Sequence, residues 1–184
     1  MALEIVTDRV RIGELTQADA RALFNYRSDE EVRRFQSWLP DSVDDARAFI
    51  AGNASTPFDQ PDSWYQLAIR SALTDELVGD LGVHFLPDGH QAEIGVTIAP
   101  AHQRQRCAAA AVTALLGHLF TIMNKHRVFA SVDPRNAASM ALFRRVGMRQ
   151  EAHFSRSLLW RGEWVDDVVF GLLQSEWKER RSLL

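Results

Sequence analysis

Apolar and polar residues alternate near the start of the chain, which is the pattern of a half-buried β-strand. In "DRVRIGEL" the apolar residues Val10 and Ile12 are separated by polar neighbours, which predicts a first strand. Three further segments have strand character and are connected by "SALTD" and "PDGH", which contain the turn residues of hairpins. These predicted strands are "SWYQLAIR", "ELVGDLGVHFL" and "QAEIGVTIA".

Two helices are predicted between the first strand and the second. Thr16 is followed three residues later by Asp19, and Ser42 is followed in the same way by Asp45. A hydroxyl residue with an acidic residue at this spacing indicates a capped helix N-terminus. The segment "DDARAFI" after the second signal therefore predicts a second helix that packs near the first.

Two more helices and three strands are predicted in the second half. Helical spacing on one face is found for Ala108, Val112, Leu115 and Leu119. The segment "NAASMALFRRVG" predicts a helix with Asn136 as N-cap and Gly147 as C-terminal stop. "RVFASV" predicts a strand between these helices, and two strands joined around Arg161 and Gly162 follow. The last residues, "KERRSLL", are expected to form a solvated end. The order βααβββαβαββ predicts one α/β domain over residues 1–184 with a central sheet.

The composition is that of an ordinary globular protein and narrows the possible functions. Hydrophobic residues make up 46% and charged residues 24%, which excludes disordered and fibrous proteins. The net charge of -3 gives no general attraction to nucleic acid or to an anionic membrane. No membrane span or signal peptide is recognisable, and the single cysteine, Cys107, suits a reducing compartment. We therefore expect a cytoplasmic location, with neither nucleic acid nor membrane as a partner.

The stretch "IAPAHQRQRCAAAAVTALL", from Ile98 to Leu116, has the layout of a phosphate-binding turn that runs into a helix. A helix N-terminus offers unpaired N–H donors and the positive end of a dipole to an anion. A backbone that folds closely around phosphate usually needs glycine, yet none lies between Gly95 and Gly117, and arginines stand in the turn instead. The alternative is an alanine-rich helix start that only packs on the sheet.

The order of elements and three segments together resemble the GNAT acetyltransferase superfamily. "AEIGVTIAPAHQRQRCAAAA" is similar to its acyl-CoA-binding pattern Q/R-x-x-G-x-G/A, here Gln103 to Ala108. "VDPRNAASMALFRRVGMRQEA" is similar to its N-x-x-S…L-F-x-x-x-G-F segment. "WRGEWVDDVVFGLLQSEW" resembles the ending of the RimJ/RimL branch, which is named for acetylation of ribosomal-protein N-termini. The resemblance covers nearly the whole chain, from Thr7 to Trp177.

The resemblance implies a mixed, mostly antiparallel sheet flanked by helices, with a V-shaped splay between the fourth and fifth strands. It implies direct transfer of an acetyl group from acetyl-CoA to a primary amine, either a protein N-terminus or a small-molecule amine, without a metal. In the family, a bulge splays the fourth strand, whose backbone N–H groups polarise the thioester carbonyl. The residues that the resemblance assigns to cofactor binding are Val96, Ile98, Gln103, Arg104, Gln105, Arg106, Cys107, Ala108 and Asn136.

Arg106 departs from the family pattern, which usually has glycine at this position. With the negative φ that is usual in a first helical turn, its side chain can swing outward and its guanidinium could pair with cofactor phosphates. With a positive φ, a non-glycine residue costs roughly 1–2 kcal/mol and the loop rearranges. We expect a negative φ, and weakened or altered cofactor binding rather than its complete loss.

Two residues are candidates for the proton transfers of the reaction. By the resemblance, Ser139 would protonate the CoA sulfur, and Asn136, three residues earlier, would bond the pantetheine arm or fix a water. The alternative is an ordinary N-cap followed by a solvated serine. Glu93 is the candidate base, or an exposed strand carboxylate. The six histidines show no metal-ligand spacing, and Trp38 is a candidate wall of the acceptor site.

The sequence therefore predicts a GNAT-fold N-acetyltransferase, a monomer or homodimer, that acts on an amine with acetyl-CoA as co-substrate. One alternative is a binding or regulatory protein of this fold whose CoA loop is degenerate because of Arg106. Another is an enzyme for a different acyl-CoA, since the loop governs the nucleotide and not the acyl group. The identity of the acceptor and of the general base stays open at this point.

Overall fold

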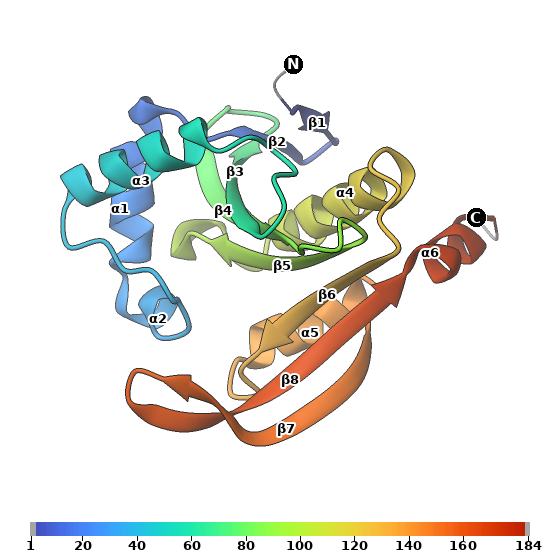
Figure 1. Ribbon diagram of the computed structural model, residues 1–184. Coiled ribbons are helices and arrows are strands. Elements are labelled where there is room, and N and C mark those ends of the chain that lie inside the picture. Colours follow the sequence, from blue (N-terminus) through green and yellow to red (C-terminus); the bar gives the residue numbers. More distant parts are fainter. Residues whose placement is uncertain (1–2, 183–184) are drawn as a thin grey trace.

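A mixed sheet of eight strands forms the centre of the computed structural model, which describes residues 3–182 (Figure 1). The strands lie in the order β1-β2-β3-β4-β5-β6-β8-β7, and all neighbours are antiparallel except β5 and β6. The predicted mixed, mostly antiparallel sheet is therefore confirmed. The strands are β1 (Ile5–Val6), β2 (Val10–Glu14), β3 (Ser63–Ser71), β4 (Leu77–Phe85), β5 (Gln91–Ile98), β6 (Arg127–Val132), β7 (Arg149–Trp160) and β8 (Glu163–Leu173).

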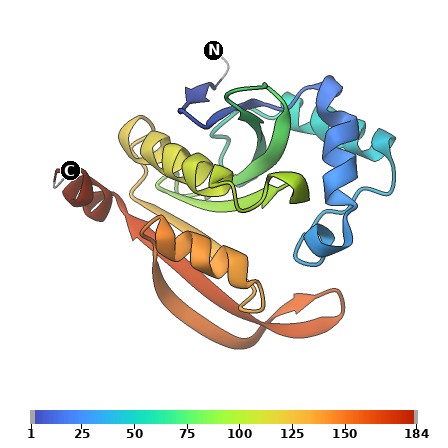
Figure 2. The same ribbon diagram turned by 180° about the vertical axis from the view of Figure 1, so that it is seen from behind.

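Helices cover both faces of this sheet. Helices α1 and α3 lie over one face, and α4 and α5 lie over the other, which is the face seen from behind (Figure 2). The helices are α1 (Ala20–Arg27), α2 (Glu30–Arg33), α3 (Val43–Ser55), α4 (Cys107–Thr121), α5 (Ala137–Arg145) and α6 (Gln174–Ser182), with 3-10 turns at Gln17–Asp19 and Pro100–His102.

Three of these elements, β1, α2 and α6, are missing from the order predicted from sequence. Strand β1 has two residues and α2 has four, too few to show a period. The helix α6 begins at Gln174, where the last strand was expected to continue and then to give way to a solvated end. It is held by Trp177, which is buried and packs against Phe120 of α4. Residues 183 and 184 of the predicted solvated end lie outside the described residues.

The predicted helix ends are confirmed by their capping contacts. The Ser42 hydroxyl accepts a hydrogen bond from the amide of Asp45 at 3.1 Å, and Oδ1 of Asn136 accepts one from the amide of Ser139 at 3.1 Å. Gly147 follows α5 with a φ of +91°, a conformation that glycine adopts at little energetic cost. The local sequence therefore sets where α3 and α5 begin and where α5 stops.

Two apolar clusters hold the helices on the sheet. Behind the sheet, α4 contributes the fully buried side chains Val112, Leu115 and Leu119, which confirms the apolar face predicted for this helix. In front, α1 and α3 contribute Leu23 and Ile50, which pack in one cluster with the strand residues Ala68 and Leu77. The sheet thus has a core on each face.

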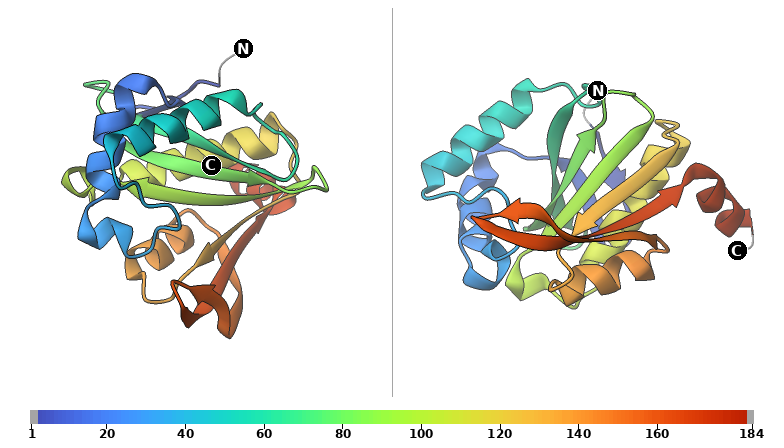
Figure 3. Two further views of the ribbon diagram at one scale, coloured as in Figure 1. Left: turned by 60° about the vertical axis from the view of Figure 1, so that its left-hand side comes forward. Right: turned by 60° about the horizontal axis from the view of Figure 1, so that its bottom comes forward.

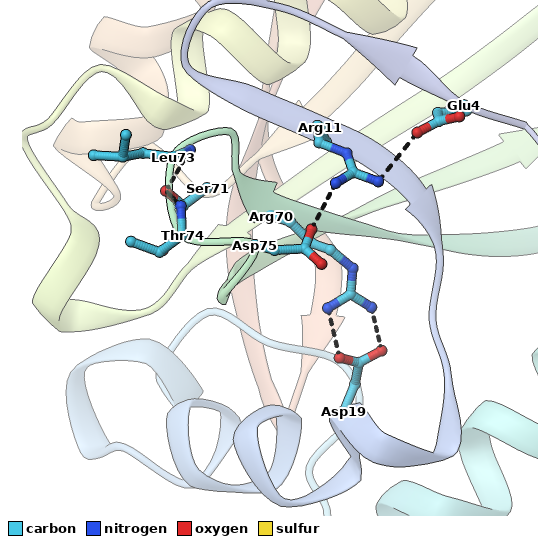
Figure 4. Close-up of polar contacts among 8 residues, drawn as sticks. All are labelled: Glu4, Arg11, Asp19, Arg70, Ser71, Leu73, Thr74 and Asp75. Carbon is cyan, nitrogen blue, oxygen red and sulfur yellow. Dashed lines mark hydrogen bonds and ion pairs between the residues drawn. The ribbon is translucent and has the colours of Figure 1, made fainter.

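An ion pair ties the start of α1 to β3 (Figure 4). The guanidinium of Arg70 donates to both carboxylate oxygens of Asp19, at 2.9 and 2.6 Å. Asp19 also accepts from the amide of Thr16 at 2.7 Å, so the predicted capping pair exists, although it opens a 3-10 turn that leads into α1. Burial acts to raise the pKa of Asp19, but the hydrogen bonds from Arg70 and Thr16 outweigh burial and the pKa is lowered.

The long β7–β8 hairpin curls beneath the front face and reaches α2 (Figure 3). At its tip, the guanidinium of Arg161 donates to the carbonyl of Arg33 at 2.6 Å and to that of Gln36 at 3.0 Å. The hairpin and the segment after α2 therefore meet on the side of the sheet where β5 and β6 lie.

Candidate active site

Strands β5 and β6 diverge after a short parallel contact, as predicted for the fourth and fifth strands. Pairing runs from Gln91 and Arg127 to Glu93 and Phe129 and then ends. The register of β5 against β4 is unbroken from Ala92 onward, so the bulge expected from the resemblance is absent from this pairing. The divergence arises because β5 stays with β4 while β6 stays with β8.

The divergence leaves backbone amides of β5 facing the opening. The amide of Ala99 donates to the carbonyl of Val78 on β4 at 2.9 Å. Successive amides of a strand point to opposite sides, so those of Val96 and Ile98 point away from β4, where no β6 residue pairs with them. The opening is therefore lined by oriented backbone donors from β5.

A cleft of about 730 Å³ occupies this opening. The sheet contributes Gly82 and Gly95, and a Cβ added to Gly95 would have no atom within 4 Å, so this part of the cleft is open down to the backbone. Aromatic side chains from α3, β3, α5, β7 and the segment after α2 form its walls. Among them is Trp38, which is stacked on Phe49 of α3 with ring centroids 4.1 Å apart. Trp38, the candidate acceptor wall, is therefore one of the residues that line the cleft.

A buried hydrogen-bond network lies at the base of the cleft. Asp80 of β4 is fully buried and accepts from Nη2 of Arg27 at 2.5 Å and also from Tyr26 and Gln66. Arg27 in turn donates to Gln36 at 2.6 Å. Burial and the negative charge of Asp80 raise the pKa of Tyr26, so its hydroxyl stays protonated.

Sequence reasoning missed this network. The one residue that could have indicated this network is Asp80, a carboxylate in the middle of the predicted strand "ELVGDLGVHFL". A charged residue at such a position is rarely buried without a partner. The partners Tyr26 and Arg27 lie more than 50 residues away in sequence, at separations of 54 and 53.

Glu93, the candidate base, lines the cleft and is 24% exposed. Burial raises the pKa of its carboxyl, the nearby His84 acts to lower that pKa, and Asp167 on β8 adds to the increase. A carboxylate with a raised pKa binds a proton more readily near neutral pH, as a general base must. Glu93 is thus a half-buried cleft residue and not the exposed strand carboxylate of the alternative interpretation.

The first turn of α5 brings both Asn136 and Ser139 to the cleft. Oδ1 of Asn136 is engaged as the N-cap, so the ordinary capping role considered for this residue is real. Ser139 is half-buried in the cleft lining rather than fully solvated. The cleft therefore holds a carboxylate from β5 and a hydroxyl from α5 on its two sides.

The loop before α4 adopts a conformation that the sequence interpretation did not expect. Arg106 has a φ of 65° and Arg104 a φ of 60°, so the prediction of a negative φ at Arg106 is wrong. The reason is that residue 106 is the N-cap of α4 and not a residue of its first turn; the helix begins at Cys107. Two left-handed arginines within three residues cost roughly 1–2 kcal/mol each.

Glutamine side chains brace this loop from within. Gln103 donates to the carbonyl of Ile98 at 3.2 Å, and Gln105 donates to that of Ala101 at 2.8 Å. The first amides of α4, among them those of Cys107 and Ala108, precede the first helical hydrogen bond, which runs from Ala110 to Arg106. The braced loop thus presents the start of the helix as a set of anion donors.

The predicted cofactor residues divide into separate groups in space. Val96 and Asn136 line the cleft. Arg106 lines a second groove, of about 1290 Å³, on the outer side of α4. The other arginines of this groove are Arg9, Arg145, Arg180 and Arg181. The other predicted cofactor residues, all of them among those described, line neither the cleft nor the second groove, and along the chain they connect one hollow to the other. They are Ile98, Gln103, Arg104, Gln105, Cys107 and Ala108.

With this geometry in view, the comparisons with known proteins decide the family. Residues 9–149 match the acetyltransferase (GNAT) domain. The chain belongs to the GNAT acetyltransferase family. The crystal structure of a GNAT-family acetyltransferase from Bacillus anthracis superposes on this GNAT protein with a TM-score of 0.86 and 25% identity, covering 95% of this chain and all of that one.

Two relatives of this GNAT protein are similar over almost their whole length. The uncharacterized N-acetyltransferase YnaD of Bacillus subtilis (strain 168) is 29% identical over 178 residues, 95% of this chain and 99% of its own. The ribosomal protein uS5 alanine N-acetyltransferase of Escherichia coli (strain K12) is 24% identical over 187 residues, 97% of this chain and 95% of its own. The chain is therefore an N-acetyltransferase of the GNAT family.

Neither a metal-ligand cluster nor a membrane-spanning helix is found among the described residues. Between residues 3 and 182, no three His, Cys, Asp or Glu side chains gather closely enough to hold a metal ion. Within that same range, no helix has the length and apolar character needed to span a membrane.

Proposed function

We propose that this GNAT protein transfers an acetyl group from acetyl-CoA directly to a primary amine within the cleft between β5 and β6. The observation that carries the proposal is the placement of Glu93 and Ser139 in one cleft, beside amides of β5 that have no partner strand. A general base, a general acid and an oxyanion donor are the groups that acyl transfer to an amine needs.

The residues present fit acetyl-CoA. The start of α4 and the guanidinium groups of Arg104 and Arg106, which have no partner among residues 3–182, suit a diphosphate. An anion is favoured by both helix-end amides and arginine. The open backbone at Gly95 leaves room for the acyl end. The left-handed φ of Arg106 supports weakened or altered binding, because a side chain stands where close backbone approach is needed.

The residues of the chain divide the reaction between them. Acetyl-CoA supplies a thioester whose carbonyl carbon is attacked by the amine. Glu93 accepts the proton that the acceptor ammonium must lose to become a nucleophile. The amide of Val96 donates a hydrogen bond to the developing oxyanion, and Ser139 delivers a proton to the departing sulfur. Each group acts at a different atom of the transition state.

The proposed acceptor is a protein N-terminus or a small-molecule amine. Support for a protein N-terminus comes from the similarity to the ribosomal protein alanine N-acetyltransferase. The aromatic walls at Trp38 and Phe49 favour an acceptor with apolar groups near the amine. We expect the protein to act in the cytoplasm as a monomer or homodimer.

Calorimetry with acetyl-CoA, followed by a thiol-release assay, tests the proposal. The acceptors are spermidine and a short peptide that begins with alanine, and Glu93→Gln is the matched variant that removes the base without changing side-chain size. We expect acetyl-CoA binding, thiol release with at least one acceptor, and a loss of release in the variant.

Two outcomes support the alternatives. Binding of acetyl-CoA without release in a wider panel of amines indicates a binding or regulatory protein. Faster release with propionyl-CoA or a longer acyl-CoA indicates a different donor. Absence of any CoA binding overturns the proposal.

A further inference from the structure

A row of three side chains crosses the front face of the sheet beside the cleft. The register pairs Trp64 of β3 with His84 of β4, and His84 with Glu93 of β5. Side chains of directly opposed strand residues lie on the same face, so His84 stands between the other two. Glu93 and Trp64 line the cleft, whereas His84 is not among the described residues that line it.

The orientation of His84 is set by its neighbours. Its ring is stacked on Trp64, with centroids 5.1 Å apart and planes inclined by 11°. Nδ1 lies 4.0 Å from Oε2 of Glu93, and Nε2 lies 3.4 Å from Oδ1 of Asp62. The two ring nitrogens therefore face two different carboxylates.

Asp62 is held in place by the backbone at the other end of this row. Its amide donates to the carbonyl of Phe85 at 2.7 Å, and its φ is 55°. Its side chain is 75% exposed, against 22% for His84 and 24% for Glu93. The three groups thus lead from the half-buried base to a carboxylate in solvent.

A general base that takes a proton in every turnover must also lose it in every turnover. Glu93 opens into the cleft, and an acceptor amine and a thioester in the cleft would displace the water on that side. While both substrates are bound, the route to solvent that the described side chains offer runs through His84 and Asp62, behind the carboxylate. We infer that His84 carries the proton from Glu93 to Asp62 and the solvent. This inference rests on the function proposed above.

The transfers balance in protons and charge. The acceptor R–NH₃⁺ gives a proton to the Glu93 carboxylate and becomes the neutral nucleophile. The carboxylic acid passes this proton to Nδ1 of His84, and the imidazolium releases the proton on Nε2 to Asp62 or water. The starting tautomer returns by proton exchange with water. The 4.0 Å gap exceeds a hydrogen bond, so the first transfer needs one bridging water or a small rotation of Glu93.

The charged groups around this relay are few. Asp62 precedes β3, Glu93 lies on β5, and Asp167 on β8 acts on Glu93 through its charge. Because His84 does not line the cleft, it acts through Glu93 and does not touch the acceptor. It is therefore a positioning residue in the reaction. Its loss would have a different pH dependence from that of a residue needed only for folding.

The first test is the pH dependence of kcat/KM for His84→Gln, with acetyl-CoA and the better of spermidine and the alanine peptide. We expect a loss of roughly 10- to 100-fold near neutral pH, at the low end of general-base effects because water substitutes in part. The loss should shrink as the pH rises and the free amine becomes available without a base. A loss that is the same at every pH overturns the relay.

Chemical rescue and two matched variants sharpen this test. Imidazole added to His84→Ala should restore part of the activity, and Asp62→Asn should show a smaller loss than His84→Gln. His153→Gln should keep wild-type activity, because His153 forms a comparable pair with Asp166, at 2.8 Å, outside the cleft lining. Failure of imidazole to rescue, together with an unshifted pH profile, contradicts the role of His84.

A measurement without substrates separates the relay from the proposed function. The Glu93 carboxyl can be titrated by carbon NMR in the full chain, and His84→Gln should raise its pKa further because His84 acts to lower it. His153→Gln should leave that pKa unchanged. An unchanged titration in His84→Gln overturns the inference even if the wild type is active. If the wild type acetylates neither acceptor, the proposed function fails for them, and the titration still decides the coupling.

Discussion

The base of the cleft and the loop before α4 are built in opposite ways. At the base, Asp80 and Arg27 are buried and their charges are paired. In the loop, Arg104 and Arg106 are exposed, have left-handed backbones and make no hydrogen bond or ion pair with residues 3–182. The base of the cleft is thus ordered by charges that the protein pairs itself, whereas the loop holds two strained arginines without a partner among the described residues. Mutation, salt and pH should therefore affect the two regions differently.

Breaking the buried pair should have the largest effect. Asp80→Asn leaves the Arg27 charge buried without a counter-charge, and removing one partner of a buried pair costs about 3–5 kcal/mol. The free energy of unfolding from chemical denaturation measures this loss. Arg11→Ala is the control, because its pairs with Glu4 and Asp75 are exposed and should contribute at most about 1 kcal/mol. Equal losses in the two variants would contradict the comparison.

Ser139→Ala should lower turnover while acetyl-CoA affinity changes little. A leaving-group acid acts in the transition state, so its loss lowers kcat by ~10²- to 10⁴-fold, less where water substitutes. Steady-state kinetics and calorimetry measure the two quantities separately. An unchanged kcat with a good acceptor would contradict this prediction and remove Ser139 from the mechanism.

Replacing the left-handed arginines by glycine should relieve strain on the loop side. Removing the backbone strain stabilises the folded state by roughly 1–2 kcal/mol, and the entropy that glycine adds to the unfolded chain offsets part of this. The free energy of unfolding should therefore increase by up to about 1 kcal/mol in Arg104→Gly or Arg106→Gly. The Tm should rise by about 2–4 °C. We expect Arg106→Gly also to tighten CoA binding, because the backbone can then approach the diphosphate.

Arg106→Ala separates strain from charge. It keeps the Cβ, so it should gain no stability, and its CoA affinity reports whether the guanidinium pairs with a phosphate. Weaker binding by both Arg106→Ala and Arg106→Gly, with a steeper salt dependence in the wild type, would replace the strained-loop interpretation by an arginine clamp.

The smallest effect is expected from the titration of Asp19, whose ion pair with Arg70 joins the start of α1 to β3. The folded-state pKa of Asp19 lies below its ordinary value of 3.8, so the stability it contributes is fully present above about pH 4 and is lost as the pH falls through the folded pKa. Asp19→Asn should therefore flatten the acid limb of the unfolding free energy against pH. A limb as steep as that of the wild type would assign acid sensitivity to other carboxylates.

Local patterns in the sequence were enough to predict most of the fold. Alternation located β2, apolar segments and turn residues located β3 to β6, and the capping residues Ser42 and Asn136 located the starts of α3 and α5. These patterns depend only on residues that are close together in the sequence, so each can be recognised within a single segment. Helix α6 was missed because Trp177 is the single large apolar residue that holds it, and its packing on Phe120 is a tertiary contact.

The identity of the candidate site residues could be predicted from the sequence, but the backbone conformation of the loop before α4 could not. Glu93, Asn136 and Ser139 could be named from the family resemblance, and they meet in the cleft. The φ of Arg106 could not be predicted, because it depends on where the helix begins and not on the residue type. The role inferred for His84 could not be predicted either, since it depends on cross-strand neighbours that only the sheet register defines.

The contact at the tip of the β7–β8 hairpin bears on when the site is completed during synthesis. Arg161 and the carbonyl of Arg33 are 128 residues apart in sequence, and β8 is also the partner strand that holds β6 away from β5. A ribosome-bound chain that still lacks its last segment would expose the edge of β6 and leave the cleft without its lower wall. Contacts of such long range form late because loop closure must come first. Catalytic competence should therefore appear only after release of the full chain, and the unpaired edge of β6 is the surface that a chaperone would need to cover until then.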